Sequence, residues 1–440
     1  MNGRLSERGS GRRLSRRQFL QTTGAAAATV VLGGLPTPRG GFSQTVPLPA
    51  PEASGIEHVV MVMMENRSFD HFLGWLDGAD GRQAGLRYVD AAGVTHRTHR
   101  LAPDFQGCDH PDPDHSFTGG RIELNGGACD GWLRAGDNDD YAIGYYTKKD
   151  LAFLGNAAPQ WTACDRYFAS IMAETFPNRM YQHAAQTDRL TNSVELSTLP
   201  TIWDLLAEAG LDGRYYFSDV PLLALWGTRY LPIARTFDQF LADAAAGTLP
   251  NLAFVDPSFL GEDVGTSNDD HPHADIRNGE AFLNLVYRAV TTSPAWPSTV
   301  LVFTYDEWGG FFDHVPPPTA PIPAADQIAG NTDGLLGFRV PSLVVSPFAA
   351  REQVSHVTFD HTSVLRMVEW RWNLPALTVR DSTANNLAEA LDFTTRSLRA
   401  KQFKVPEGPF GTACPTAARA AAATDWEELR AIADATGWPE

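Results

Sequence analysis

The stretch Ile56-Glu-His-Val-Val-Met-Val-Met-Met-Glu-Asn-Arg-Ser68 begins with a mostly apolar run and then becomes abruptly polar. A short apolar run of this kind is typical of a strand that is buried on both faces of a sheet. The same order recurs in three further segments, 251–255, 299–305 and 340–345, which are followed by Asp256-Pro257, Asp306-Glu307 and Ser346-Pro347. The pattern predicts several buried strands that end in polar groups.

Segments with helical periodicity lie between these strands. We expect helices over residues 201–206, 279–290 and 361–372, the last with one apolar face made by Val364, Leu365, Val368 and Trp372. Strands that alternate with helices predict an α/β fold, here an α/β/α sandwich with a central, mostly parallel sheet. Ligands of such sheets bind beyond the carboxyl ends of the strands, so the polar residues found there are candidates for a functional site.

The composition indicates a globular protein, because 43% of the 440 residues are hydrophobic and 20% are charged. The net charge is −17, and the first forty residues, with seven Arg and one Glu, contribute +6, which leaves −23 for the rest. So acidic a chain argues against a nucleic-acid partner, whose phosphates would need Lys and Arg. An anionic substrate would have to be bound by local groups or by a metal.

The N-terminal residues resemble an export signal. Arginines precede a small, moderately apolar run over residues 24–34, and Ser15-Arg-Arg-Gln-Phe-Leu20 resembles the twin-arginine motif. We expect residues 1–46 to be a twin-arginine signal peptide and linker, recognised by the twin-arginine export machinery. The mature protein would then be secreted or held in the cell envelope.

The four cysteines, Cys108, Cys129, Cys164 and Cys414, lack the paired spacing of a structural zinc site. Cys108 and Cys129 lie in a Gly/Asp-rich region and could form a disulfide outside the cytoplasm. Four unlinked, buried cysteines are the alternative, and the sequence leaves both open.

Two polar pairs follow apolar strands some 240 residues apart, Glu65-Asn66 and Asp306-Glu307. Their oxygens could converge on one hard divalent cation, although either pair alone would suit a turn or a helix cap. Gly309-Gly310 after the second pair predicts a close approach of the backbone to another part of the molecule. His314 follows within a few residues of these carboxylates.

Thr175 precedes Pro177, which suits the first turn of a helix. A phosphate is favoured at such a helix start, and a metal-activated Thr hydroxyl would be a competent nucleophile there, although Thr175 alone would equally suit an N-cap. His115, His271 and His314 could each hold a phosphoryl oxygen or protonate a leaving group. A single His is also common as a structural residue.

Five longer motifs carry a family resemblance, namely residues 65–74, 175–179, 268–272, 305–318 and 337–347. In this order they resemble the bacterial phosphoesterase family of phosphatidylcholine-type phospholipases C and related acid phosphatases, in the alkaline-phosphatase-like superfamily. The resemblance covers about residues 55–395. It implies an α/β/α sandwich and metal-assisted phosphoryl transfer through a Ser or Thr ester.

The resemblance also implies roles for individual residues. The metal ligands would be Glu65, Asn66, Asp306, Glu307 and Thr175, of which Thr175 would also be the nucleophile. His115 and His271 would contact the phosphoryl group, and His314 fits the pattern less directly. An all-oxygen ligand set favours one or more divalent ions such as Ca²⁺, Mg²⁺ or Mn²⁺ over zinc.

We therefore expect a secreted phospholipase C that cleaves the glycerol–phosphate ester of phosphatidylcholine-like lipids to diacylglycerol and phosphocholine. Its substrate would bring it into transient contact with a membrane surface. The alternatives are an acid phosphatase-type phosphomonoesterase with the same site, a sulfatase, which would need a modified Cys or Ser in place of Thr175, and an inactive metal-binding envelope protein.

These expectations suggest a division of the chain. Residues 47–400 would form the phosphoesterase catalytic domain, in which residues 77–160, rich in Gly, Asp, Asn and His, would be a loop-rich cap. Residues 401–440 would be a C-terminal extension with one short helix over about 424–435, where Thr424 and Glu427 stand at capping-box spacing.

Overall fold

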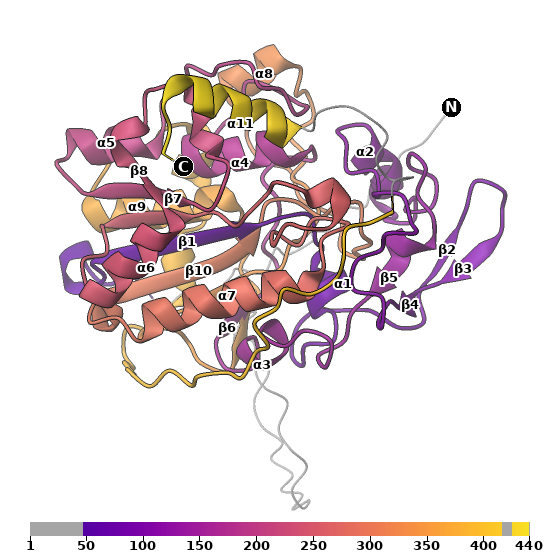
Figure 1. Ribbon diagram of the computed structural model, residues 1–440, viewed down its shortest axis with the longest axis horizontal. Helices are drawn as coiled ribbons and strands as arrows, with labels where there is room; N and C mark the ends of the chain where they lie inside the picture. Colours follow the sequence, from indigo (N-terminus) through magenta and orange to yellow (C-terminus); the bar gives the residue numbers. More distant parts are fainter. Residues whose placement is uncertain (1–46, 416–424, 440) are drawn as a thin grey trace, which may run out of the picture. The chain divides into compact units, whose positions relative to one another are not determined.

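The computed structural model describes residues 47–415 and 425–439. Within this part of the chain, an eight-stranded sheet has helices on both faces (Figure 1). The strands follow one another across the sheet in the order β12 (Gln353–Ser355), β6 (Thr162–Cys164), β11 (Leu343–Val345), β10 (Thr299–Tyr305), β1 (His58–Met64), β9 (Leu252–Val255), β7 (Gly213–Phe217) and β8 (Ala234–Thr236). Only β11 runs antiparallel to its neighbours, so the described sheet is mostly parallel, as predicted.

The predicted strands are present, and three of them start later than expected. β10 has the predicted bounds, β1 begins at His58, and β9 begins at Leu252. The segment predicted over 340–345 pairs only from Leu343 onward. Pro341 explains the difference, because proline has no N–H to donate to a neighbouring strand.

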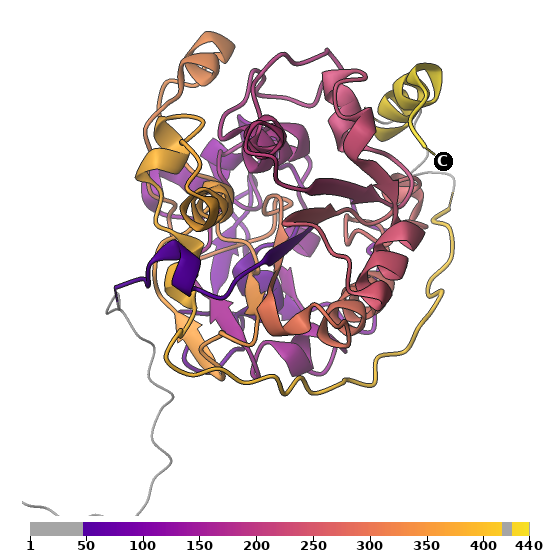
Figure 2. The same ribbon diagram turned by 90° about the vertical axis from the view of Figure 1, so that its left-hand side faces the viewer.

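The helices form two layers. α4 (Thr175–Ala184), α5 (Ile202–Glu208) and α9 (His361–Trp372) lie on one face of the sheet, and α6 (Phe237–Ala246) and α7 (Ile276–Thr291) lie on the other (Figure 2). The predicted helix over 361–372 is confirmed at both ends. α5 and α7 start where Thr201 and Asp275 cap them, so α7 begins three residues before the predicted position.

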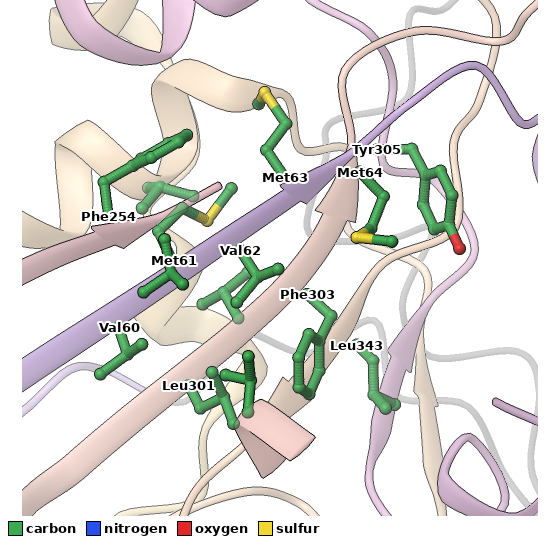
Figure 3. Close-up of a cluster of buried hydrophobic side chains, with 14 of the residues drawn as sticks. Val60, Met61, Val62, Met63, Met64, Phe254, Leu301, Phe303, Tyr305 and Leu343 are labelled. Atoms are coloured by element: carbon green, nitrogen blue, oxygen red, sulfur yellow. The ribbon is translucent and has the colours of Figure 1, made fainter. Parts of the chain in front are cut away.

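The core is densest around the two central strands. Every residue of β1 from Val59 to Met64 is fully buried, and β10 is buried throughout. Their side chains meet those of β9 and β11, such as Phe254 and Leu343 (Figure 3). Burial on both faces explains why these strands have continuous apolar runs rather than alternating polarity.

The segment over residues 77–160 contains only short elements, as its composition predicts. They are β2 (Arg87–Val89), β3 (Thr95–Arg97), β4 (His99–Arg100), α2 (Gly119–Leu124), β5 (Gly144–Tyr145) and α3 (Leu154–Ala157). Further short helices are α1 (Phe69–Leu73), α8 (Ala324–Ala329) and α10 (Val379–Thr383). Among the described residues, no helix is long and apolar enough to cross a membrane.

The disulfide joins Cys108 to Cys414, so the pairing of Cys108 with Cys129 was wrong. The two residues are 306 positions apart in sequence, and the C-terminal segment reaches Cys108 because it lies along the loop that precedes it. Gln106 in that loop hydrogen-bonds the backbone of Thr412 in both directions. Cys129 and Cys164 are buried free thiols.

The predicted C-terminal helix is present as α11 (Asp425–Thr436). Thr424 lies outside the described residues, so the predicted capping box is not described. The proposed signal peptide and linker, residues 1–46, likewise lie outside them.

Candidate active site

The two predicted polar pairs meet at the carboxyl edge of the sheet. β1 and β10 are parallel neighbours in a register that pairs Met64 with Tyr305, so the next residue of each strand leaves the sheet beside the other. The backbone N–H of Asp306 donates to the carbonyl oxygen of Met64 at 3.0 Å. The backbone N–H of Asn66 donates to Oδ1 of Asp306 at 3.1 Å. Strand pairing therefore brings together groups that are 240 residues apart.

Two glycines let the surrounding loops close on one another. A Cβ on Gly309 would lie 2.1 Å from the carbonyl oxygen of Asn66, and one on Gly310 would lie 2.7 Å from Cβ of Pro113. Both glycines have positive φ, 62° and 67°, which other residues rarely adopt. Asn66 itself has φ 60°, a conformation that Asn tolerates better than most residues. The predicted close backbone approach is confirmed.

Thr175 is the first residue of α4, and its side chain faces the strand-end carboxylates. The hydroxyl donates a hydrogen bond to Oε2 of Glu65 at 3.1 Å, and Thr175 is 3% exposed. The N-cap of α4 is Glu174, whose side chain makes no capping hydrogen bond. The alternative that Thr175 is an N-cap was therefore wrong, since its hydroxyl is used across the site rather than along its own helix.

Arg179, one turn further along α4, links the ends of β1, β9 and β10, the last through Oδ2 of Asp306, 3.5 Å from its Nε. Its Nε donates to Oε1 of Glu65 at 2.7 Å, and its Nη1 donates to Oδ1 of Asp256 at 2.8 Å. Its Nη2 donates to the carbonyl oxygen of Met63 at 3.1 Å, and its side chain is fully buried. We did not predict a role for Arg179 or Asp256. Asp256 could have been predicted as a site residue, because it follows a predicted strand as Glu65 and Asp306 do.

Three buried oxygens of the predicted ligands have no hydrogen-bond partner. They are Oδ1 of Asn66, Oδ2 of Asp306 and Oε1 of Glu307, of which Oδ2 of Asp306 has a cationic neighbour, Nε of Arg179 at 3.5 Å. Burial also raises the pKa of the Glu65 and Glu307 carboxyl groups well above the usual value. Unpartnered buried oxygens are costly, and a hard divalent cation would compensate that cost, since carboxylate and amide oxygens are its preferred ligands. The residues present therefore fit the predicted ion.

The carboxylates of Glu65, Asp306 and Glu307 are not sufficient by themselves to form such a metal site. Among the described residues, groups of His, Asp and Glu with ligand atoms within 4.8 Å of one another occur elsewhere, for example Asp112, His115 and His271. Glu65, Asp306 and Glu307 do not form such a group by themselves. A cation at the strand ends would need the oxygens of Asn66 and Thr175 as well.

His115 and His271 border this centre. Nδ2 of Asn66 donates to Nε2 of His115 at 3.3 Å, and Nδ1 of His115 donates to the carbonyl oxygen of Pro113 at 2.7 Å. This arrangement directs the amide nitrogen of Asn66 to the imidazole and leaves its Oδ1 for a cation. The ring centroids of His115 and His271 are 6.0 Å apart. The structure thus brings both histidines to the side of the predicted metal centre where Asn66 lies.

The two histidines have opposite electrostatic surroundings. Burial disfavours the charged form of both, but the carboxylates of Glu307 and Asp112 outweigh it at His115 and raise its pKa to about 10. Burial and the neighbouring His115 lower the pKa of His271 well below the usual value. The hydrogen bond that His115 accepts from Asn66 requires the neutral ring. A cation that neutralised Glu307 would favour this form.

His314 lies in a different cluster. Its Nδ1 is 2.5 Å from Oδ2 of Asp70, and its Nε2 is 3.1 Å from Oδ1 of Asp80. Arg339 contacts the other oxygen of Asp70 at 3.2 Å. Burial opposes protonation of His314, but Asp70 outweighs it and the pKa is raised. These contacts tie α1 to the loop after β10, and none of them supports the predicted phosphoryl contact.

The sequence matches known families over most of its length. Residues 56–375 match the model of the Phosphoesterase family. Residues 13–33 match the twin-arginine translocation pathway signal sequence, which confirms the predicted export signal and indicates export by that route.

Similar proteins include phospholipases C from bacteria and plants. "Phospholipase C A" of Mycobacterium tuberculosis is 32% identical over 461 residues, which cover 87% of this chain and 86% of the relative. "Non-specific phospholipase C1" of Arabidopsis thaliana is 31% identical over 373 residues, which cover 75% of this chain and 69% of the relative. A solved protein of the alkaline phosphatase superfamily from Vibrio parahaemolyticus overlaps 76% of this chain and 70% of its own, with a TM-score of 0.38 and 10% identity. That structural similarity is too low to support any conclusion beyond those from the sequence matches.

Proposed function

This chain belongs to the Phosphoesterase family, and we propose that it is a phospholipase C that uses Thr175 to hydrolyse the glycerol–phosphate ester of phosphatidylcholine-like lipids. The products would be diacylglycerol and phosphocholine. The names of the bacterial and plant relatives, which match over most of their length, support the reaction. The preference for a choline head group is a further part of the proposal.

The main observation in support of Thr175 as the nucleophile is its hydrogen bond to Oε2 of Glu65. Nearby oxygens of Asn66, Asp306 and Glu307 have no hydrogen-bond partner. A nucleophilic hydroxyl needs an acceptor for its proton, and this one has a carboxylate oxygen at 3.1 Å. Arg179 holds the other oxygen of the same carboxylate, so the acceptor is fixed in orientation. A hard divalent cation, when bound here, would stabilise negative charge at the reacting oxygens.

The residues would divide the reaction as follows. Oγ1 of Thr175 attacks phosphorus and its proton passes to Glu65, while the bond to the glycerol oxygen breaks and a phosphothreonine ester forms. His115 donates a proton to the leaving oxygen from its protonated form, in which Nε2 no longer accepts from Asn66. Water then attacks phosphorus, the bond to Oγ1 of Thr175 breaks, Thr175 recovers its proton from Glu65, and phosphocholine leaves. His271, whose pKa is lowered, remains neutral and can accept the proton of this water.

A paired assay tests the proposal. Turnover of a chromogenic phosphocholine ester and of a chromogenic phosphomonoester is compared, each with and without a chelator. We expect a higher kcat/KM for the phosphocholine ester and loss of activity with chelator. Preference for the monoester would indicate a phosphomonoesterase with the same machinery. Metal binding without turnover of either ester would indicate the inactive envelope protein, and full activity after exhaustive chelation would exclude the metal.

A further inference from the structure

The C-terminal helix α11 packs its aromatic residue against the segments that carry the proposed site. Trp426 is 2% exposed and stacks flat on Phe259, with ring centroids 3.9 Å apart and an interplanar angle of 3°. Its edge meets the ring of Phe176, next to Thr175, at 5.0 Å and 71°. In Figure 1, α11, in yellow, lies beside α4. A residue 251 positions after Thr175 therefore covers the start of the nucleophile helix.

The same aromatic pair contacts Arg179. The guanidinium carbon lies 4.7 Å from the ring centroid of Phe259 and 5.8 Å from that of Trp426. The guanidinium has carboxylates of Glu65 and Asp256 along its edge. The two carboxylates and the two nearby aromatic rings together fix the orientation of the guanidinium group. The rings also keep water from a group whose ion pairs depend on burial.

Polar contacts hold α11 in this position. Arg430 donates to the carbonyl oxygen of Asp219, whose carboxylate accepts the backbone N–H groups of Phe259 and Leu260 at 3.0 Å each. Burial raises the pKa of the Asp425 carboxyl group, and the side chain of Asn192, which favours its charged form, acts to lower that pKa and accepts the backbone N–H of Phe176 at 2.8 Å. α11 is therefore connected to both Phe259 and Phe176, the two rings that Trp426 touches.

We propose that Trp426 is a positioning residue, which through Phe259 and Phe176 holds Arg179 and Thr175 in register with the carboxylate of Glu65. This inference rests on the proposed function. Replacement of the flat ring by a branched side chain leaves Arg179 with less support on one side, and Glu65 moves with it. A displacement near 1 Å at a reacting group costs about 10²-fold in rate. The effect falls on catalysis more than on substrate binding, because Trp426 is 2% exposed and therefore offers almost no surface to a substrate.

The chain offers a matched control in Trp438. This residue is 5% exposed, follows the same helix, and packs on Phe217 at 6.3 Å while its Nε1 donates to the carbonyl oxygen of Gly227 at 3.1 Å. Neither contact reaches α4 or Arg179. Trp438→Leu therefore removes a buried indole of the same C-terminal segment without touching the aromatic pair.

The test compares Trp426→Leu, Trp426→Phe and Trp438→Leu in the full chain, by kcat and KM on the chromogenic phosphocholine ester, by melting temperature, and by calorimetric titration with Mn²⁺ alone. We expect Trp426→Leu to lower kcat about 10- to 100-fold with KM within about threefold, and to weaken Mn²⁺ binding. Trp426→Phe, which keeps a flat ring, should restore most of kcat. Trp438→Leu should lower the melting temperature and keep the wild-type kcat.

Two results would overturn the proposal. One is wild-type kcat and Mn²⁺ affinity in Trp426→Leu. The other is a loss in Trp438→Leu as large as that in Trp426→Leu at the same melting temperature, which would make the helix a general stabilising element. A wild-type protein without turnover is a separate result, which refutes the proposed function, and the Mn²⁺ titration then decides the positioning role by itself.

Discussion

Replacement of Thr175 by Val removes one hydroxyl and almost nothing else. Valine has nearly the same shape, and Thr175 is 3% exposed, so no cavity forms and the start of α4 keeps its packing. The hydroxyl makes one hydrogen bond, to Oε2 of Glu65 at 3.1 Å. The change therefore isolates the chemical role of a single oxygen atom.

The effects on stability and on activity should differ greatly in size. Loss of the donor leaves a buried carboxylate oxygen unpartnered, which costs about 1–3 kcal/mol. Loss of the nucleophile removes the covalent pathway, and turnover should fall by roughly 10⁴-fold or more. A stability loss of that size cannot produce such a fall in activity while the protein remains folded.

The assay is kcat/KM on the chromogenic phosphocholine ester, with urea unfolding of the same preparations. Thr299→Val is the control, because Thr299 is also fully buried and donates to the carbonyl oxygen of Ala295 at 2.7 Å, at the opposite end of β10 from Asp306. It should lose comparable stability and keep its activity, and Thr175→Ser should retain turnover. Near-normal turnover of Thr175→Val would refute the assignment of the nucleophile.

Further predictions concern the metal, the histidines, pH and export. Elemental analysis of protein purified without added metal should find Ca, Mg or Mn, and stoichiometric zinc would contradict the all-oxygen site. His115→Gln and His271→Gln should each lower turnover about 10²–10⁴-fold with little change in melting temperature, and a histidine whose variant keeps wild-type rates from pH 5 to 9 is not catalytic. Burial raises the pKa of Glu280 to about 8, so the folded state keeps a proton that the unfolded state loses above its lower pKa. The free energy of unfolding should therefore fall by up to about 1.4 kcal/mol per pH unit between the pKa of Glu280 in the unfolded state and that in the folded state. Urea unfolding at a series of pH values should show a smaller slope for Glu280→Gln. An unchanged slope would assign the effect to another group. Replacement of both Arg16 and Arg17 by Lys should leave precursor in the cytoplasm, as immunoblotting of cell fractions would show, whereas undiminished export would indicate another route.

The parts of the site that could be predicted from the sequence are those with a local cause. An apolar run that turns polar marks the end of a buried strand, so the sequence alone locates Glu65-Asn66 and Asp306-Glu307 at strand ends. Gly309-Gly310 marked a close backbone approach, because the freedom of glycine is a property of the residue itself. The helix over 361–372 followed from the period of its apolar residues.

The tertiary structure alone decided which distant segments meet. Cys108 pairs with Cys414 and not with the nearer Cys129, because the C-terminal segment lies along the loop before Cys108. Trp426 contacts Phe176 of α4 and the distant Phe259, and no periodicity in its own segment indicates that. His314 is close to Glu307 in the chain, yet its ring turns to Asp70 and Asp80. Local patterns determine which elements form, while contacts between elements depend on how all of the buried surfaces and charges are satisfied together, which no short stretch of sequence contains.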